Sequence, residues 1–312
     1  MKKSIRVFAP ASIGNIGSGF DVMGMCIDAP GDEVKLTLNS SGILHIKKIS
    51  GDNGKLSADP KKNTVTVAIQ ALLNQIKSKQ GFDVELHKKM PLGSGLGSSA
   101  ASAVAGAFAA NYLLGNPIKK RKDLISFAME GERIACGTAH ADNVAPSMLG
   151  GISLIRSNKP LEIISLAVPK NLHVVVVHPH VEVLTKDARA VMRKEIPMSD
   201  AIQQWGNTAA LVAGFYTNDL ALIGRAVQDV VAEPFRSKLI PGFDAVKDAA
   251  LKNGALGCSI SGSGPSIFAF CESKKISKTV GAAMQKQFSL IKIKSDAYIS
   301  KVNSKGVRII SK

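Results

Sequence analysis

A stretch from Met90 to Ile118 carries no charged residue, and it constrains the fold of this 312-residue chain more than any other feature. It is long enough to span a bilayer. It opens with glycine and serine, however, and its body is mostly alanine, glycine and serine, so membrane insertion is poorly favoured. We therefore predict no membrane span. We predict instead a buried helix of closely packed small residues over about 98–114, preceded by a glycine-rich loop.

The overall composition predicts a globular chain of about two domains. Hydrophobic residues make up 45% and charged residues 21% of the sequence, which excludes a disordered chain. The length corresponds to roughly two domains of ordinary size. Strand and helix patterns are mixed throughout, and the segment 156–169 is the least patterned. We place a boundary there and predict domains at 1–165 and 166–312.

The charge balance limits the possible macromolecular partners. Lys and Arg outnumber Asp and Glu by 40 to 24, a formal net charge of +16, but the basic residues form short scattered clusters such as Lys88-Lys89 and Lys119–Lys122. We interpret these clusters as a solvated surface, and attraction of a nucleic acid or another polyanion is the alternative. Aromatic residues, at 5%, are too scarce to form a stacking platform for single-stranded nucleic acid.

The cysteines and the N-terminus indicate the cellular compartment. The four cysteines form no CxxC pair, which argues against a zinc site or a disulfide framework. Unpaired thiols fit a reducing compartment. The opening MKKSIRVFAP has no long apolar segment of the kind that a signal peptide needs. We therefore predict a cytoplasmic protein.

The strongest local motif is the glycine-rich segment Pro91–Ala100, PLGSGLGSSA, between a predicted strand at 82–87 and the predicted alanine-rich helix. Glycines let backbone amides approach an anion, and the N-terminus of the following helix adds unpaired N–H groups and a positive dipole end. The segment lacks the lysine of a Walker loop and the GxGxxG spacing of a dinucleotide-binding turn. Taken alone, it is as typical of an ordinary loop as of a phosphate-binding one.

Three further polar clusters could belong to a site, although each taken alone has an ordinary structural explanation. They are the segment 10–21 with Asn15 and Asp21, the predicted polar turn 138–143 with His140 and Asn143, and the turn 261–265. Asn and Asp are frequent in turns for structural reasons, and HxDN has no recognised metal-ligand spacing. Downstream, Thr185 is predicted to cap a short helix that runs to Met192.

Taken in order, four segments resemble the motifs of the GHMP kinase superfamily, which includes galactokinases and mevalonate kinases. They are PASIGNIGSGFDVMG, PLGSGLGSSAAS, GTAHADNVAPSMLGG and SISGSGPSIFAF, and the second is similar to the phosphate loop PxxxGLGSSAA of that superfamily. The resemblance spans residues 5–300. The pieces NxGxGFDxMG, HADNVAP, TKDARA and AEPFRSKLIPGF favour the branch that acts on L-homoserine.

The resemblance implies a two-domain α+β fold. The N-terminal, ATP-binding domain would be like a small ribosomal protein with a left-handed βαβ crossover, and the C-terminal domain would be ferredoxin-like. The implied reaction is ATP + L-homoserine → ADP + O-phospho-L-homoserine, a step toward threonine, in a cleft between the domains. The resemblance also implies a homodimer, with no nucleic-acid or membrane partner.

For the amino acid, the resemblance places charged residues where a zwitterion needs them. L-Homoserine carries an ammonium, a carboxylate and a free hydroxyl, and a bidentate Arg gives a carboxylate strength and orientation. Asp21 and Asn15 would hold the ammonium end, Arg189 and Arg236 the carboxylate, and Gly262 would lie behind the substrate. Without the resemblance, both arginines would be interpreted as surface charges.

For the nucleotide, the resemblance implies contacts from the whole loop. ATP would bind at Pro91, Leu92, Gly93, Ser94, Gly95, Leu96, Gly97, Ser98, Ser99, Ala100 and Ala101. Glu132, helped by Ser99, would hold Mg²⁺, which takes one or two protein oxygen ligands and completes its shell with phosphate and water. Glu130 is the nearby rival for this role.

The transfer itself is expected to proceed without a general base. Where related mevalonate kinases can use an aspartate, this sequence offers Asn143, and an amide cannot take a proton. A loose phosphoryl-transfer transition state needs positioning and charge neutralisation more than a base. We therefore predict direct in-line transfer, in which Asn143 orients the hydroxyl, His140 supports the site and Ser99 assists at the phosphates.

Three alternatives remain open at this point. One is a kinase of the same superfamily acting on another alcohol such as mevalonate, for which Asp21 would lack a cationic partner. Another is a basic nucleic-acid-binding protein, which would leave the glycine loops unexplained. The last is a regulatory relative without activity.

Overall fold

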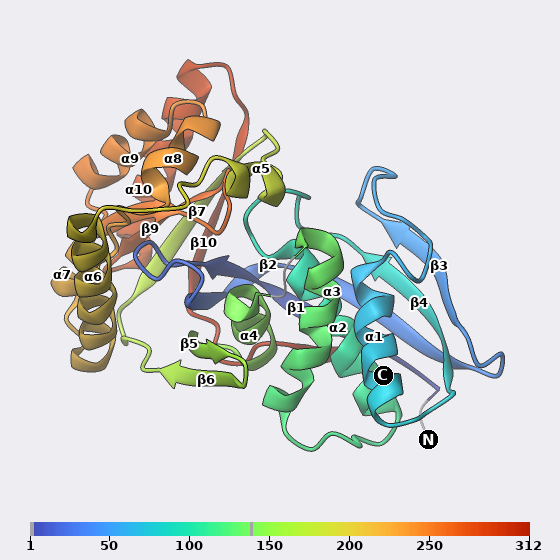
Figure 1. The fold of residues 1–312 in the computed structure, drawn as a ribbon. Coiled ribbons are helices and arrows are strands. Elements are labelled where there is room, and N and C mark those ends of the chain that lie inside the picture. Colours follow the sequence, from blue (N-terminus) through green and yellow to red (C-terminus); the bar gives the residue numbers. More distant parts are fainter. Residues whose placement is uncertain (1–2, 138–139) are drawn as a thin grey trace.

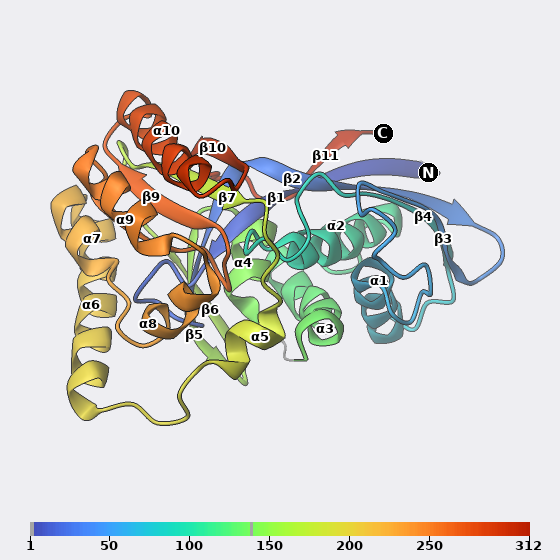
Figure 2. The same cartoon turned by 90° about the horizontal axis from the view of Figure 1, so that it is seen from above.

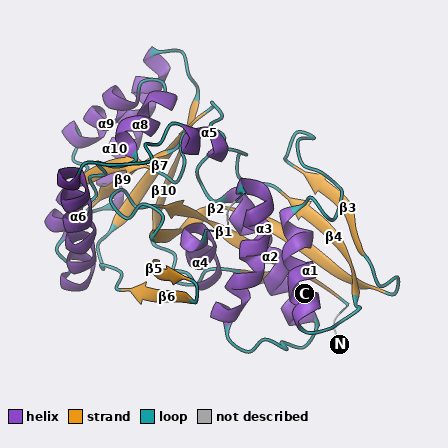
Figure 3. Ribbon diagram, in the orientation of Figure 1, coloured by secondary structure: helices purple, strands orange, loops and turns teal. Residues whose placement is uncertain are grey.

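The computed structural model describes residues 3–137 and 140–312, except for the side chain of Cys136, and shows two β-sheets flanked by helices (Figures 1 and 3). Within these residues the larger sheet has seven strands in the order β11-β1-β2-β4-β3, with β5 paired to β2 and β6 paired to β5. Its strands are β1 (Ser4–Gly14), β2 (Met23–Asn39), β3 (Leu44–Ser50), β4 (Gly81–His87), β5 (Ile152–Asn158), β6 (Leu161–Leu166) and β11 (Arg308–Ser311).

Four α-helices cover one face of this sheet (Figure 2). They are α1 (Thr64–Gln75), α2 (Ser98–Leu113), α3 (Ile125–Cys136), which follows the short turn η1 (Arg121–Leu124), and α4 (Ala141–Leu149). β3 and β4 pair in parallel and are joined through α1, so these three elements form a βαβ unit.

The smaller sheet has four strands among the described residues, in the antiparallel order β10-β7-β9-β8. Its strands are β7 (His173–Pro179), β8 (Gly257–Ile260), β9 (Ile267–Cys271) and β10 (Ser295–Lys301). The helices of this half are α5 (Thr185–Ala190), α6 (Met198–Thr217), α7 (Leu220–Ala226), α8 (Glu233–Arg236) with η2 (Ser237–Leu239), α9 (Phe243–Lys252) and α10 (Lys274–Leu290). The α+β fold expected from the sequence is confirmed.

The uncharged stretch of the sequence forms the buried helix that was predicted. Nearly all of α2 is buried, and the helix contacts α1, α3, α4 and the strands β1 and β2. Gly106 shows why small residues are needed, because a Cβ there would lie 2.8 Å from the carbonyl oxygen of Val65 on α1. No helix in the described part of the chain is long and apolar enough to cross a membrane.

The run of valines in β7 joins the two cores of the molecule. Val174 and Val176 belong to the hydrophobic cluster of the larger sheet, whereas Val175 and Val177 belong to the cluster under α9 and α10. Successive side chains of a strand point to opposite faces. The prediction that this strand is buried on both faces is confirmed.

Three local predictions differ from the structure. The glycine- and serine-rich segment after Pro10 continues as strand to Gly14, because it pairs with the first part of β2. The polar turn predicted at 138–143 contains the start of a helix, α4, while residues 138–139 lie outside the described residues. Thr185 does not cap α5, because Leu184 has the extended backbone of the N-cap and Thr185 is the first helical residue.

The chain crosses between the two halves more than once. β6 of the larger sheet is followed by β7 of the smaller one, near the predicted boundary at 165–166. After β10 the chain returns, and β11 pairs with β1 at the edge of the larger sheet. The division into 1–165 and 166–312 stays a prediction.

Candidate active site

A cavity of about 350 Å³ is lined by residues from both halves of the chain. It brings together most of the predicted site: Asn15, Asp21, Leu92, Gly93, Ser94, Gly95, Gly97, Ser98, Ser99, Glu132, His140, Asn143, Arg189, Arg236 and Gly262. The predicted residues that do not line it are Pro91, Leu96, Ala100 and Ala101. The side chains of Leu96, Ala100 and Ala101 are packed in the hydrophobic core. These three residues could therefore contact a nucleotide only through their backbone.

The glycine-rich loop leaves the N-terminus of α2 open to the cavity. Gly93, Gly95 and Gly97 all have positive φ, which side chains disfavour. Gly95 lies against the turn between β8 and β9, where Ser261 Oγ donates to its carbonyl oxygen at 2.8 Å. Gly97 is the N-cap of α2 and supplies no side-chain cap. The first N–H groups of this long helix are therefore available to an anion such as phosphate.

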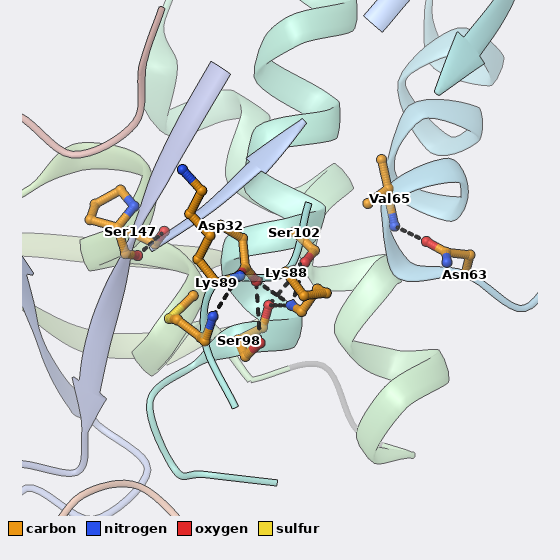
Figure 4. A network of polar contacts seen from close by, with 10 residues as sticks. Asp32, Asn63, Val65, Lys88, Lys89, Ser98, Ser102 and Ser147 are labelled. Carbon is orange, nitrogen blue, oxygen red and sulfur yellow. Dashed lines mark hydrogen bonds and ion pairs between the residues drawn. The ribbon is translucent and has the colours of Figure 1, made fainter. Parts of the chain in front are cut away.

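A buried ion pair between Lys88 and Asp32 lies directly behind the loop (Figure 4). Their side chains are 1% and 0% exposed. Lys88 Nζ also donates to the Ser98 carbonyl at 2.9 Å and to Ser102 Oγ at 2.8 Å, and Asp32 Oδ1 accepts from the Lys89 N–H at 2.9 Å. The pair thus ties the chain before the loop to the first turn of α2. The interpretation of Lys88 as part of a solvated cluster is wrong, although Lys89 is exposed.

Asp21 and Arg189 face each other in the cavity. Arg189 Nη2 donates to Asp21 Oδ1 at 2.7 Å and lies 3.1 Å from Nε2 of His140. Burial lowers the pKa of His140, with the positive charges of the nearby arginines adding to this effect and Asp21 opposing it. The imidazole is therefore neutral at pH 7 and can accept the hydrogen bond from Arg189.

Arg236 presents a buried guanidinium to the cavity. The residue is 3% exposed, and its Nε and Nη1 donate to the carbonyl oxygens of Ala188 (3.2 Å) and Gly262 (3.0 Å). Its guanidinium lies over the Phe20 ring, 4.8 Å from the centroid, and that of Arg189 lies over the same ring at 5.2 Å. Burial lowers the pKa of Arg236, and Arg189 adds to this effect. Among the described residues, no carboxylate lies within ion-pair distance of Arg236, so the site favours an anionic ligand.

The side chain of Asn15 forms hydrogen bonds with backbone groups next to Arg236 and Asp21. Its Nδ2 donates to the Gly262 carbonyl at 2.9 Å, and its Oδ1 accepts from the Asp21 N–H at 3.0 Å. Asn15 and Asp21 both have positive φ. The amide of Asn15 therefore holds the turn that carries Asp21, which places Asn15 beside the predicted ammonium site.

Asn143 and Asp142 line the cavity from the first turn of α4. Asn143 Nδ2 lies 3.3 Å from Asp142 Oδ2, to which it donates. Asp142 is buried, and this burial, together with the nearby carboxylates of Asp21 and Glu132, raises its pKa to about 7. The part of the cavity around Asn143 therefore holds the acidic groups of Asp142, Asp21 and Glu132.

Comparison with known proteins identifies the family. The family models for the N-terminal and C-terminal domains of GHMP kinases match residues 63–151 and 211–290. A homoserine kinase from Chlorobaculum tepidum is 52% identical across 99% of both chains. The chain belongs to the GHMP kinases.

Solved structures show the same relationship. The homoserine kinase from Cytophaga hutchinsonii, whose crystal structure is known, is 56% identical in sequence to this GHMP kinase. The two structures match with a TM-score of 0.97 over 99% of this chain and 98% of that chain. A mevalonate kinase from L. major, 16% identical with a TM-score of 0.72 over 95% of both chains, shares the fold alone.

The oxygen donors near the loop of this GHMP kinase fit Mg²⁺. Glu132 on α3 is buried and lines the cavity, as do the hydroxyl-bearing residues Ser98 and Ser99. Carboxylate and hydroxyl oxygens are hard ligands of the type that Mg²⁺ prefers. Glu130 is not part of the cavity lining and instead forms an exposed ion pair with Arg133 at 3.0 Å. Of the two glutamates, only Glu132 therefore lies where it could hold a metal in the cavity.

Sequence reasoning missed several residues that line the cavity. Asp142 lies between the predicted site residues His140 and Asn143, and the prediction of a polar turn over 138–143 does not indicate that its carboxylate lines the cavity. The apolar residues Val144, Ala145 and Met148, at helical spacing, are the signal that could have predicted α4. Residues 62–64 at the start of α1 also line the cavity, although no motif marks them.

Proposed function

We propose that this GHMP kinase transfers the γ-phosphoryl group of MgATP to the hydroxyl of L-homoserine. The observation that carries the proposal is Arg236, a buried guanidinium that faces the cavity with only carbonyl partners and no carboxylate within ion-pair distance among the described residues. A ligand carboxylate would supply the missing counter-charge. The full-length similarity to homoserine kinases supports the same substrate.

A zwitterionic amino acid complements the charges around Arg236. The substrate carboxylate would bind the guanidinium groups of Arg236 and Arg189, which both lie over the Phe20 ring. The ammonium would bind Asp21, which pairs with Arg189 in this structure. When the substrate binds, Asp21 and Arg189 can give up their mutual contact, Asp21 for the ammonium and Arg189 for the carboxylate. Neither charged side chain is then left without an opposite charge.

The nucleotide would bind with its phosphates at the N-terminus of α2. Backbone amides of the loop and of the first helical turn would hold the phosphate oxygens, because Gly97 leaves these donors uncapped. Glu132 and Ser99 would hold Mg²⁺, which supplies neutralisation of the phosphate charge when bound. The Lys88–Asp32 pair would keep the loop in place from behind.

The acceptor hydroxyl would be oriented by Asn143. Its Oδ1 can accept the hydroxyl proton in a hydrogen bond while the hydroxyl oxygen attacks the γ-phosphorus. The new O–P bond forms as the bond to the β,γ-bridging oxygen breaks. The hydroxyl proton then leaves its hydrogen bond with Oδ1 and passes to an oxygen of the transferred phosphoryl group, so no side chain has to accept it. This route needs alignment and charge neutralisation. The homodimer implied by the sequence resemblance stays a prediction.

The substrate is tested by measuring ADP release with a panel of alcohols. We expect L-homoserine to support turnover with MgATP, L-serine to support much less because its hydroxyl is one methylene nearer the ammonium, and mevalonate and galactose to support none. The reason is that only an amino acid satisfies both Asp21 and Arg236. Turnover on mevalonate or galactose without turnover on L-homoserine would overturn the proposal.

The absence of a base at the acceptor is tested with Asn143→Asp. We expect the phosphoryl-transfer rate to fall by about 10- to 100-fold, because the new carboxylate lies against Asp142 and adds negative charge next to the incoming phosphates. The measurement is single-turnover transfer as a function of pH for both proteins. A faster variant whose rate falls at low pH would show that the site works better with a base, against the proposed route.

A further inference from the structure

Ser12 on β1 joins the glycine-rich loop to Asn143, the residue that we propose orients the acceptor hydroxyl. Its side chain is fully buried. Its backbone N–H donates to the carbonyl oxygen of Leu96 in the loop at 3.1 Å, and its hydroxyl donates to Asn143 Oδ1 at 2.9 Å. One residue therefore contacts both the donor side and the acceptor side of the cavity.

Two glycines allow this contact by leaving space around the Asn143 amide. A Cβ on Gly97 would lie 2.2 Å from Ser12 Oγ and 2.9 Å from Asn143 Oδ1. A Cβ on Gly14 would lie 2.6 Å from Asn143 Nδ2. The amide is thus enclosed by backbone on two sides, and the Ser12 hydroxyl is held against its oxygen.

The hydrogen bonds of Asn143 select one of the two orientations of its amide. In the observed orientation Nδ2 donates to the Asp142 carboxylate and Oδ1 accepts from Ser12. Rotation of the amide by half a turn would place Oδ1 against an oxygen of the Asp142 carboxylate, which disfavours it. The Ser12 hydroxyl can donate or accept, so the Asp142 contact sets the orientation and Ser12 then holds Oδ1 in it. Ser12 satisfies one lone pair of Oδ1, and the second lone pair remains for another donor.

We propose that Ser12 is a positioning residue for phosphoryl transfer, which holds the Asn143 carbonyl oxygen so that its second lone pair meets the hydroxyl of the acceptor. The inference rests on the proposed function, since it assigns the alignment of that hydroxyl. It also explains why the loop and Asn143 are tied to the same residue: the attacking oxygen and the phosphates must keep a common alignment. Ser12 itself is fully buried and does not line the cavity, so it would act through Asn143.

The test compares Ser12→Ala with Ser147→Ala. Both serines are buried and link β1 to α4. Ser147 (Figure 4) does so by donating to the Pro10 carbonyl at 2.9 Å, whereas Ser12 donates to the Asn143 side chain. We expect Ser12→Ala to lower kcat about tenfold, as for loss of one neutral hydrogen bond, with KM for ATP and for L-homoserine within twofold. Ser147→Ala should leave kcat within twofold. Thermal unfolding of both variants reports any shared loss of stability.

A double-mutant cycle with Asn143→Ala separates positioning from a general structural effect. If Ser12 acts through Asn143, Ser12→Ala should lower kcat by less than twofold in the Asn143→Ala background. Effects that multiply, a rise in KM for ATP, or an equal loss of kcat in Ser147→Ala would each overturn the inference. Failure of the wild-type protein to turn over L-homoserine would overturn the proposed function instead, so the two failures are distinguishable.

Discussion

Lys88→Met should destabilise the folded protein by about 3–5 kcal/mol and lower its Tm by about 10 °C. The substitution removes one partner of a fully buried ion pair and leaves the Asp32 carboxylate without its counter-charge. The Ser98 carbonyl, in the first turn of α2, also loses one of its donors and keeps that from Ser102 Oγ. Urea and thermal unfolding of the purified variants measure the change in free energy of unfolding.

The neighbouring lysine is the matched control for this prediction. Lys89 forms an ion pair with Glu33, and Lys88 forms one with Asp32, so the two pairs are made by adjacent residues of the same two segments. The Lys89 side chain, however, is 55% exposed, whereas that of Lys88 is 1% exposed. Lys89→Met should therefore change the free energy of unfolding by less than about 1 kcal/mol. Similar losses for the two variants would show that burial does not set the contribution of the Lys88 pair.

Arg236→Ala should weaken L-homoserine binding by roughly 30-fold to several thousand-fold. Removing one partner of a buried, hydrogen-bonded charge pair weakens binding by about 2–5 kcal/mol. Here the pair would be the Arg236 guanidinium and the carboxylate of L-homoserine. ATP binding should change by less than about threefold, because Arg236 contacts Ala188 and Gly262 and not the glycine-rich loop. Titration calorimetry with L-homoserine and with a non-hydrolysable ATP analogue measures both affinities.

Arg193 is the control for the loss of a stacked arginine. Its guanidinium lies over the Phe235 ring at 4.8 Å, but Arg193 is exposed and does not line the cavity. Arg193→Ala should leave both affinities unchanged. Equal weakening of amino-acid and ATP binding by Arg236→Ala would argue that Arg236 holds the fold of α8 and not the substrate carboxylate.

Segments with a strong local pattern were predictable from the sequence. The alternation of Phe82, Val84 and Leu86 predicted β4, and these three side chains are buried. The small residues of the uncharged stretch predicted a buried helix, because alanine and glycine suit close packing and poorly suit a bilayer. The glycines before it predicted a loop at the start of this helix, and taken alone did not decide between an ordinary and a phosphate-binding loop. In each case the signal lies within one continuous segment of the chain.

The site was predictable in part. The residues within each motif are adjacent in the sequence, but the residues that they contact lie far away in the sequence. Most of the residues carried over from the four motifs line one cavity. The motifs did not indicate Ser12, since its hydrogen bond to Asn143 spans 131 residues. Nor did they indicate that Asp142 is a buried acid beside Glu132.

The sequence by itself determined that strands and helices are mixed, and its resemblance to the GHMP kinases implied the α+β class. It also determined the glycine-rich loop and the set of charged residues available to a substrate. Only the tertiary structure decided which of those charges are buried and what they face. Lys88 and Lys89 are identical in sequence terms, yet one is buried against Asp32 and the other is exposed. Both partners come from β2, 56 residues away in the sequence, so the difference arises only when the chain is packed. Burial changes the free energy of a charge by far more than any local preference, and burial is a property of the packed chain.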